Sequence, residues 1–399
     1  MQCKYFRLLY VGWTLLLAGG AAGADQKPWF SSASVKATAD VPYPQTIRVR
    51  ILHTRRSFLL GCTGSYEYMP LNGGAVLSNA EDQHVSISRN GMTLGHRVYH
   101  ADLLISPARP SDFLMLNHRR YRGTFILEPG AGHFVDVIDQ IPIEDYLYGV
   151  LPREVGGDWP AESLKAQAVV SRTYVVANLA TDPEARFDVS NDVFSQVYGG
   201  MEDELPPANR AVDETRGEIL LNKQRKPVEA FFHSGCGGCT ETPEYVWKSH
   251  APSDDFVSVR DAYCKDDPFY HWQLTLGAGT IKARLRRAGI RVGDISKIKI
   301  TQRSPSERAW FLTIYSSRGK TVLSGQKFRM AMGPDALRST LLTDISRTSG
   351  GFHFEGRGWG HGVGLCQYGA RGRALAGQTY DQILKAYYPT AALTQVGHS

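Results

Sequence analysis

The chain has 399 residues, of which 42% are hydrophobic and 21% are charged, and its formal net charge is +6. This composition excludes a disordered or fibrous protein and allows a sizeable core divided over two or three domains. The 45 basic residues exceed the 39 acidic residues too slightly for a protein that coats nucleic acid, although the excess favours an anionic partner. Six cysteines are too few at this length for a fold built on disulfides. Function therefore has to be read from local motifs.

Residues 1–24 have the pattern of a secretory signal. Lys4 and Arg7 precede the apolar run from Leu8 to Ala18, and small residues follow up to Ala24. The run is shorter than the ~20 residues that a membrane-spanning helix needs. We therefore expect cleavage rather than retention as an anchor, with no stable membrane span afterwards. The exported protein, in the periplasm or the cell-wall space, would begin with a lead-in over residues 25–46 and carry five cysteines.

Alternating apolar and polar residues, separated by turn residues, predict short strands throughout residues 47–136. The most regular helical pattern runs from Ala161 to Leu179, with Asp158 and Pro160 placed as its N-terminal signals. Further helices are predicted at 208–216, 280–288 and 380–387, and further strands at 218–221, 228–233 and within 295–323. Because strands and helices are interspersed without regular βαβ alternation, we expect an α+β fold.

The first chemical candidate is Glu154, which we expect on a loop before the helix at 161–179. Lys165 and Arg172 are seven residues apart on that helix, so both project from one face. A carboxyl group with basic neighbours is typical of a general acid or base whose pKa is tuned by its surroundings. A simply solvated glutamate is the more common alternative.

The second candidate is a group of soft metal ligands. His233, Cys236 and Cys239 lie within seven residues, a spacing that a tetrahedral zinc ion accepts, and Cys264 is a candidate fourth ligand. A disulfide, either Cys236–Cys239 or Cys236–Cys264, is an equally good interpretation for an exported protein, and buried free thiols are a third.

The third candidate is the glycine-rich run at 356–364, whose glycines allow positive φ or a close approach of the backbone. Arg357, Trp359, His361 and Gln367 offer aromatic stacking and hydrogen-bonding edges, a combination suited to a sugar. The alternative is a tight structural loop. The run lacks the lysine of a phosphate-binding loop and the downstream acidic residue of a dinucleotide fingerprint.

Five sequence blocks resemble the SpoIID/LytB family when taken in order: IPIEDYLYGVLPREV, AESLKAQAVVSRTY, SQVYGG, AFFHSGCGGCTE and GRGWGHGVGLCQYGA. The resemblance covers about residues 137–389, most of the exported chain. It implies a catalytic region at 137–390, followed by a short tail at 391–399.

The resemblance implies an exported lytic transglycosylase that cleaves the bond between N-acetylmuramic acid and N-acetylglucosamine in peptidoglycan. Glu154 would be its single acid/base, and Lys165, Arg172, Gln196 and Tyr198 would position the glycan or the glutamate. Glu144 or Asp145 could serve as a second carboxylate in a hydrolytic version, although a place in a strand or turn is their more ordinary role.

The same resemblance implies a structural zinc ion near His233, Cys236 and Cys239, with Cys264 still a candidate ligand. Two other functions stay open. One is a non-catalytic protein that binds peptidoglycan and enhances a separate cell-wall amidase, and the other is a zinc hydrolase. We expect no nucleic-acid partner.

Overall fold

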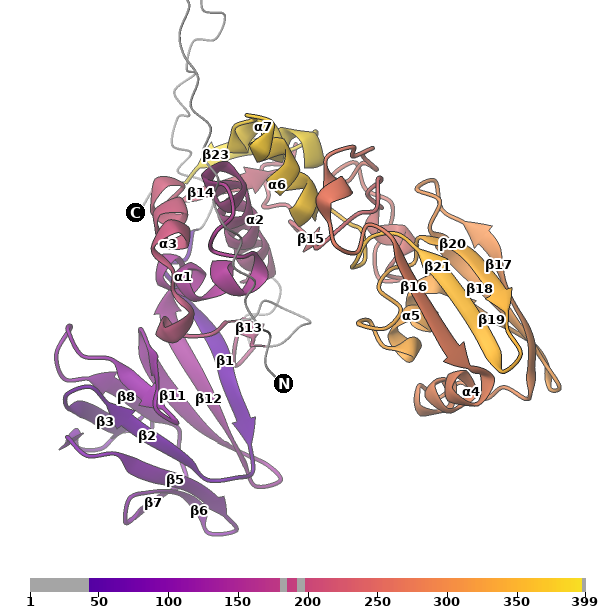
Figure 1. The fold of residues 1–399 in the computed structure, drawn as a ribbon. Helices are drawn as coiled ribbons and strands as arrows, with labels where there is room; N and C mark the ends of the chain where they lie inside the picture. The colour runs from indigo at the N-terminus through magenta and orange to yellow at the C-terminus, as the bar shows by residue number, and fades with distance from the viewer. Residues whose placement is uncertain (1–42, 180–184, 192–197, 397–399) are drawn as a thin grey trace, which may run out of the picture. The chain divides into compact units, whose positions relative to one another are not determined.

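The computed structural model describes residues 43–179, 185–191 and 198–396 (Figure 1). The expected signal segment and most of the lead-in lie outside these residues. Within them the chain forms seven α-helices and 23 strands, which confirms the α+β class. No helix in this described part is long and apolar enough to cross a membrane.

The strands predicted for residues 47–136 lie in two sheets, which are antiparallel except that β13, from later in the chain, pairs with β1 in parallel. The first is seven-stranded in the order β13-β1-β12-β11-β8-β3-β4 and the second is six-stranded in the order β10-β9-β2-β5-β6-β7 among the described residues. Their bounds are β1 Thr46–Thr54, β2 Phe58–Cys62, β3 Tyr66–Pro70, β4 Leu77–Asn79, β5 Gln83–Ser88, β6 Gly91–Leu94, β7 Arg97–Tyr99, β8 Leu103–Pro107, β9 Leu114–Leu116, β10 Arg119–Tyr121, β11 Thr124–Gly130, β12 Phe134–Pro142 and β13 Val189–Ser190. Strand β12 crosses the expected boundary at 136/137.

Strand β12 leads directly into helix α1 (Ile143–Glu154), which is followed by α2 (Ala161–Leu179). The sequence predicted α2 correctly, but it placed Glu154 on a loop and Glu144 and Asp145 in a strand or turn. All three lie in α1, because its buried side chains recur at helical spacing: Ile143, Tyr146, Leu147, Val150 and Leu151. Burial of this face stabilises the helix despite Pro152 inside it.

The C-terminal elements surround a separate buried cluster that includes side chains of α2. They are β14 (Glu218–Leu221), β15 (Phe232–His233), β22 (Leu365–Cys366), α6 (Gln367–Leu375), α7 (Tyr380–Tyr387) and β23 (Ala392–Gln395). Helix α3 (Pro206–Glu214) instead packs its buried side chains into the core shared with the two N-terminal sheets. The strand predicted at 228–233 is reduced to β15. Strands β15 and β22 pair in parallel, so two distant motifs of the sequence lie side by side.

Residues 272–356 have a hydrophobic cluster of their own. Two three-stranded sheets, β16-β21-β20 and β17-β18-β19, form around it with two helices. The bounds are β16 Trp272–Gly277, α4 Ala278–Arg287, β17 Ile295–Arg303, β18 Ala309–Ser316, β19 Gly319–Ser324, α5 Gly325–Met332, β20 Leu342–Arg347 and β21 Gly351–Gly356. We call this part the basic subdomain.

Candidate functional site

Glu154 is the last residue of α1 and is half-buried. The helix ends directly after it, where Val155 adopts an extended backbone and donates its N–H to the carbonyl oxygen of Leu151 at 2.9 Å. Glu154 lies near the fully buried Tyr146: burial raises the pKa of Tyr146 well above its usual range, and the charges of Glu154 and Tyr174 raise it further. The candidate acid therefore lies at a helix end beside a buried aromatic side chain.

Arg172, expected near the glycan, is fully buried and bonded to the protein. Its Nε donates to Glu144 Oε1 at 2.9 Å and its Nη2 to Glu144 Oε2 at 2.6 Å, so the guanidinium and carboxylate are paired at two points. Lys165 lies 2.7 Å from Glu214 and 3.0 Å from Glu162. The two basic side chains predicted beside Glu154 are thus paired with other carboxylates.

Tyr198 packs beneath α1. Its ring lies 5.1 Å from that of Tyr146, and its hydroxyl donates to Asp139 Oδ2 at 3.3 Å inside the core. The side chain is 2% exposed, so it supports the helix that ends at Glu154. Gln196, the other residue predicted from this block, lies outside the described residues.

A row of half-buried rings leads from α2 to the glycine-rich run. Tyr174 lies 6.2 Å from Phe231, Phe231 lies 4.7 Å from Trp247, and Trp247 lies 5.0 Å from His361, measured between ring centroids. Burial, with the charges of Arg329 and Arg308, lowers the pKa of His361, so its imidazole is neutral at pH 7. We call these four residues the aromatic row. Such rings offer the flat faces against which sugars stack.

The glycine-rich run packs against the segment around His233. Gly358, Gly360 and Gly364 all have positive φ, at 74°, 116° and 73°. A Cβ at Gly360 would lie 2.7 Å from His233 Cβ, and one at Gly364 only 1.9 Å from the carbonyl oxygen of Phe231. The sequence predicted that these glycines let the backbone approach another group closely. That group is the segment around His233 in the same chain.

The other three residues predicted from this run lie apart from the aromatic row. Trp359 packs edge-on against Phe269 at 4.9 Å, and the carbonyl oxygen of Arg357 accepts a hydrogen bond from Ser339 at 2.6 Å. Gln367 is buried at the start of α6, where its amide contacts Gln167 of α2 at 3.5 Å. Of the predicted sugar-binding set, His361 alone belongs to the row.

Four buried side chains form a candidate metal centre. The sulfur atoms of Cys236, Cys264 and Cys366 and a carboxylate oxygen of Asp261 all lie within 4.8 Å of one another, and the Sγ atoms of Cys236 and Cys264 are 3.3 Å apart. All four residues are at most 2% exposed. Three thiolates and one carboxylate are a donor set that tetrahedral zinc accepts. We call these four residues the cysteine–aspartate cluster.

The cysteine–aspartate cluster differs from the predicted ligand set. His233 and Cys239 are not part of it: His233 Nδ1 contacts the carbonyl oxygen of Val363 at 3.0 Å, and the Cys239 thiol contacts Ser258 Oγ at 3.2 Å. All five cysteines within the described ranges are free, so neither predicted disulfide is present. Asp261 and Cys366 were missed, because Cys366 lies 102 residues after Cys264 and is brought back by the β15–β22 pairing.

Neighbouring groups make hydrogen bonds to the cysteine–aspartate cluster. The backbone N–H groups of Cys236 and Gly369 donate to Cys366 Sγ at 3.2 and 3.3 Å, and the Tyr387 hydroxyl donates to Asp261 at 2.7 Å. Hydrogen bonds from the neighbouring cysteine thiols and from backbone lower the pKa of Cys264, whereas the hydrogen bond to Cys264 raises the pKa of Cys236 and burial raises that of Cys366. Four protein groups are the number that a tetrahedral ion takes when it has no open position.

Comparison with known proteins shows that the chain belongs to the SpoIID/LytB family. Residues 131–221 match the family described as stage II sporulation protein, and residues 247–364 match a domain of unknown function, DUF8618. The first match contains Glu154, and the second contains the whole of the basic subdomain.

Three relatives illustrate the similarity. An uncharacterized protein of Brachyspira hyodysenteriae is 30% identical over 86% of this chain and 91% of its own length. Stage II sporulation protein D of Bacillus subtilis is 31% identical over 65% of this chain and 76% of its own length. The amidase enhancer of Bacillus subtilis is 29% identical over 62% of this chain, but the matched part spans only 40% of that longer relative.

Proposed function

We propose that this protein is a peptidoglycan lytic transglycosylase with Glu154 as its acid/base. The observation that carries the proposal is the position of Glu154, half-buried at the end of α1 inside the segment that matches the family. A relative named for an amidase supports a role at the cell wall.

The chemistry needs one carboxyl group. Glu154 protonates the glycosidic oxygen between N-acetylmuramic acid and N-acetylglucosamine as the bond from C1 to that oxygen breaks. The muramic C6 hydroxyl then attacks C1, and the Glu154 carboxylate takes the hydroxyl proton. The product is a 1,6-anhydro sugar, Glu154 is regenerated in its acid form, and no water is consumed. A single carboxyl therefore replaces the pair used by hydrolytic glycosidases.

Other residues hold the glycan and the glutamate. The aromatic row provides stacking faces, with the neutral His361 as a hydrogen-bonding edge. Arg172 and Tyr198 act through packing, because both are buried against α1 and so fix the helix that carries Glu154. The other predicted substrate contacts remain part of the proposal: Lys165, Gln196, Arg357, Trp359 and Gln367.

The cysteine–aspartate cluster would hold a zinc ion that joins the loop after β15 to the start of α6. Such an ion, bound by four protein groups, stabilises the fold and leaves no position for an activated water. The four protein donors therefore favour a structural zinc ion over the catalytic zinc ion of a hydrolase.

The test is cleavage of purified glycan strands from which the peptides have been removed. We expect wild-type protein to release 1,6-anhydromuramic products, detected by mass spectrometry, and Glu154→Gln to reduce the rate at least 10³-fold. Asp213→Asn, which changes an exposed carboxylate on α3, should stay within twofold of wild type. Equal rates for Glu154→Gln and wild type would overturn the assignment.

The amidase-enhancer alternative makes a different prediction. A protein with that role would release no anhydro product from any glycan, and it would raise the rate of an added amidase on whole peptidoglycan in both wild-type and Glu154→Gln forms. Export is tested separately, by sequencing the N-terminus of the protein recovered from outside the cytoplasm; a start near Asp25 is expected.

A further inference from the structure

Positive charge is concentrated in the basic subdomain. Residues 272–356 contain 15 lysines and arginines against 5 aspartates and glutamates, a net charge of +10. The whole chain has a net charge of only +6, so the remaining residues together carry −4. This asymmetry lies in a part of the chain that none of the proposed glycan-cleaving residues occupies. Excess charge of one sign attracts ligands of the opposite sign.

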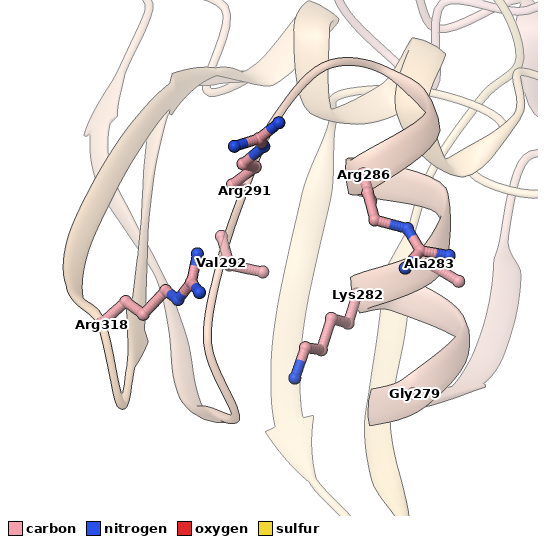
Figure 2. A pocket seen from close by; sticks show the side chains of 7 residues that line it. All are labelled: Gly279, Lys282, Ala283, Arg286, Arg291, Val292 and Arg318. Carbon is pink, nitrogen blue, oxygen red and sulfur yellow. The ribbon is translucent and has the colours of Figure 1, made fainter.

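A pocket with a volume of about 550 Å³ opens on this subdomain. Figure 2 shows α4 as one wall, with Lys282 and Arg286, and the following segment as the opposite wall, with Arg291 and Val292. Arg318, at the turn between β18 and β19, closes the same side. The size is in the range of pockets that bind small molecules.

Three of the four cations have no acidic partner within the described residues. Lys282 Nζ lies 2.9 Å from Asp294 Oδ1, whereas no carboxylate of the described chain lies within 4.0 Å of the guanidinium groups of Arg286, Arg291 or Arg318. Three unneutralised guanidinium groups around one hollow repel each other. An anionic ligand would relieve that repulsion, and the hollow would concentrate it.

The lining favours carboxylates joined by a short chain. A guanidinium group binds a planar carboxylate through two parallel hydrogen bonds, and three such groups can engage at least two carboxylates. Between them Ala283 and Val292 offer small apolar surfaces, against which methyl groups pack. We propose that the pocket binds a short acidic peptide with two or more carboxylates. That this peptide is the stem peptide of peptidoglycan rests on the proposed function.

Such a pocket gives the protein a contact with peptidoglycan that does not involve the sugar chain. It would retain the protein on strands that still carry their peptides. Because the four cations are exposed, the interaction would weaken as salt screens them.

The test is calorimetric titration of the full-length protein with the tripeptide Ala–γ-Glu–diaminopimelate at low salt. We expect binding that Arg286→Gln or Arg318→Gln weakens at least fivefold, that both together abolish, and that 0.5 M salt weakens about tenfold. Arg287 is an exposed residue of the same helix that does not line the pocket. Arg287→Gln should therefore bind the tripeptide within twofold of the wild-type affinity. The tripeptide amidated at its carboxylates should not bind.

Three outcomes overturn the inference: no binding of the tripeptide, equal loss in Arg286→Gln and Arg287→Gln, or binding of linear polyphosphate in its place, which would mark a phosphate-polymer site. Cleavage of peptide-free strands by wild-type protein is a separate readout. If that cleavage occurs without tripeptide binding, only the pocket inference fails. If the tripeptide binds and no anhydro product forms, the proposed function fails and the pocket inference stands.

Discussion

The carboxylate of Glu144 and the guanidinium of Arg172 form a buried, two-point ion pair that joins α1 to α2. The two hydrogen bonds measure 2.9 and 2.6 Å, and the Arg172 side chain is completely excluded from solvent. The backbone N–H of Gly217 also donates to Glu144, at 3.1 Å. Since α1 ends at Glu154, this pair sets where the candidate acid lies.

Glu144→Gln should lower the free energy of unfolding by about 3–5 kcal/mol, because it leaves the buried Arg172 charge unpaired. Urea denaturation measures the change. Asp254→Asn, which removes one partner of an exposed pair with Lys223, should leave stability unchanged within error. Should Glu144→Gln prove as stable as wild type, the pair would not be what fixes α1.

Gly364→Ala should destabilise the protein by roughly 3 kcal/mol or more, since the new Cβ would need both a positive φ and the space held by the carbonyl oxygen of Phe231. Gly377 also has a positive φ, of 83°, but nothing lies within 4 Å of its absent Cβ. Gly377→Ala therefore carries the conformational cost alone, about 1 kcal/mol. Comparable melting temperatures for the two variants would contradict the close packing of the glycine-rich run.

The sequence was informative where periodicity is local. Helix α2, with no internal glycine or proline, was predicted with the bounds that it has. Helix α1 was missed although its buried residues follow helical spacing, because Gly149 and Pro152 lie within it and only tertiary burial offsets their cost.

The site was harder to predict because it depends on distant pairings. The three cysteines of the cysteine–aspartate cluster come from separate elements, and the β15–β22 pairing brings Cys366 to Cys236. Asp261 carries no motif at all. Spacing within seven residues instead pointed to His233 and Cys239, whose side chains contact other groups.

The cluster makes a prediction about metal content. Wild-type protein should retain zinc after dialysis, measured as metal atoms per chain, whereas Cys366→Ala should lose it and have a lower melting temperature. Cys239→Ala should keep both, since its thiol contacts Ser258 and lies outside the cluster. Chelation should lower the melting temperature of wild type and of Cys239→Ala equally. Zinc lost from Cys239→Ala and kept in Cys366→Ala would restore the ligand set predicted from spacing.

Asp139 makes stability depend on pH. It is fully buried, its Oδ2 accepts a hydrogen bond from Tyr198, and its Oδ1 has no hydrogen-bond partner within the described residues. Burial raises the pKa of its carboxyl well above the ordinary value of 3.8, so the folded state binds a proton that the unfolded state has released. Stability from this group is therefore complete below pH 3.8 and is lost as the pH rises towards the raised native pKa.

Asp139→Asn removes that titration while keeping a side chain of similar shape. The difference in unfolding free energy, variant minus wild type, should increase in favour of the variant between pH 4 and pH 7, at ~1.4 kcal/mol for each unit by which the native pKa is raised within that window. Urea denaturation at pH 4, 5.5 and 7 measures it, and the exposed Asp254→Asn serves as the control variant. A constant difference across the three pH values would mean that Asp139 keeps its ordinary pKa, and that Tyr198, and with it α1, packs against a carboxylate that is already charged.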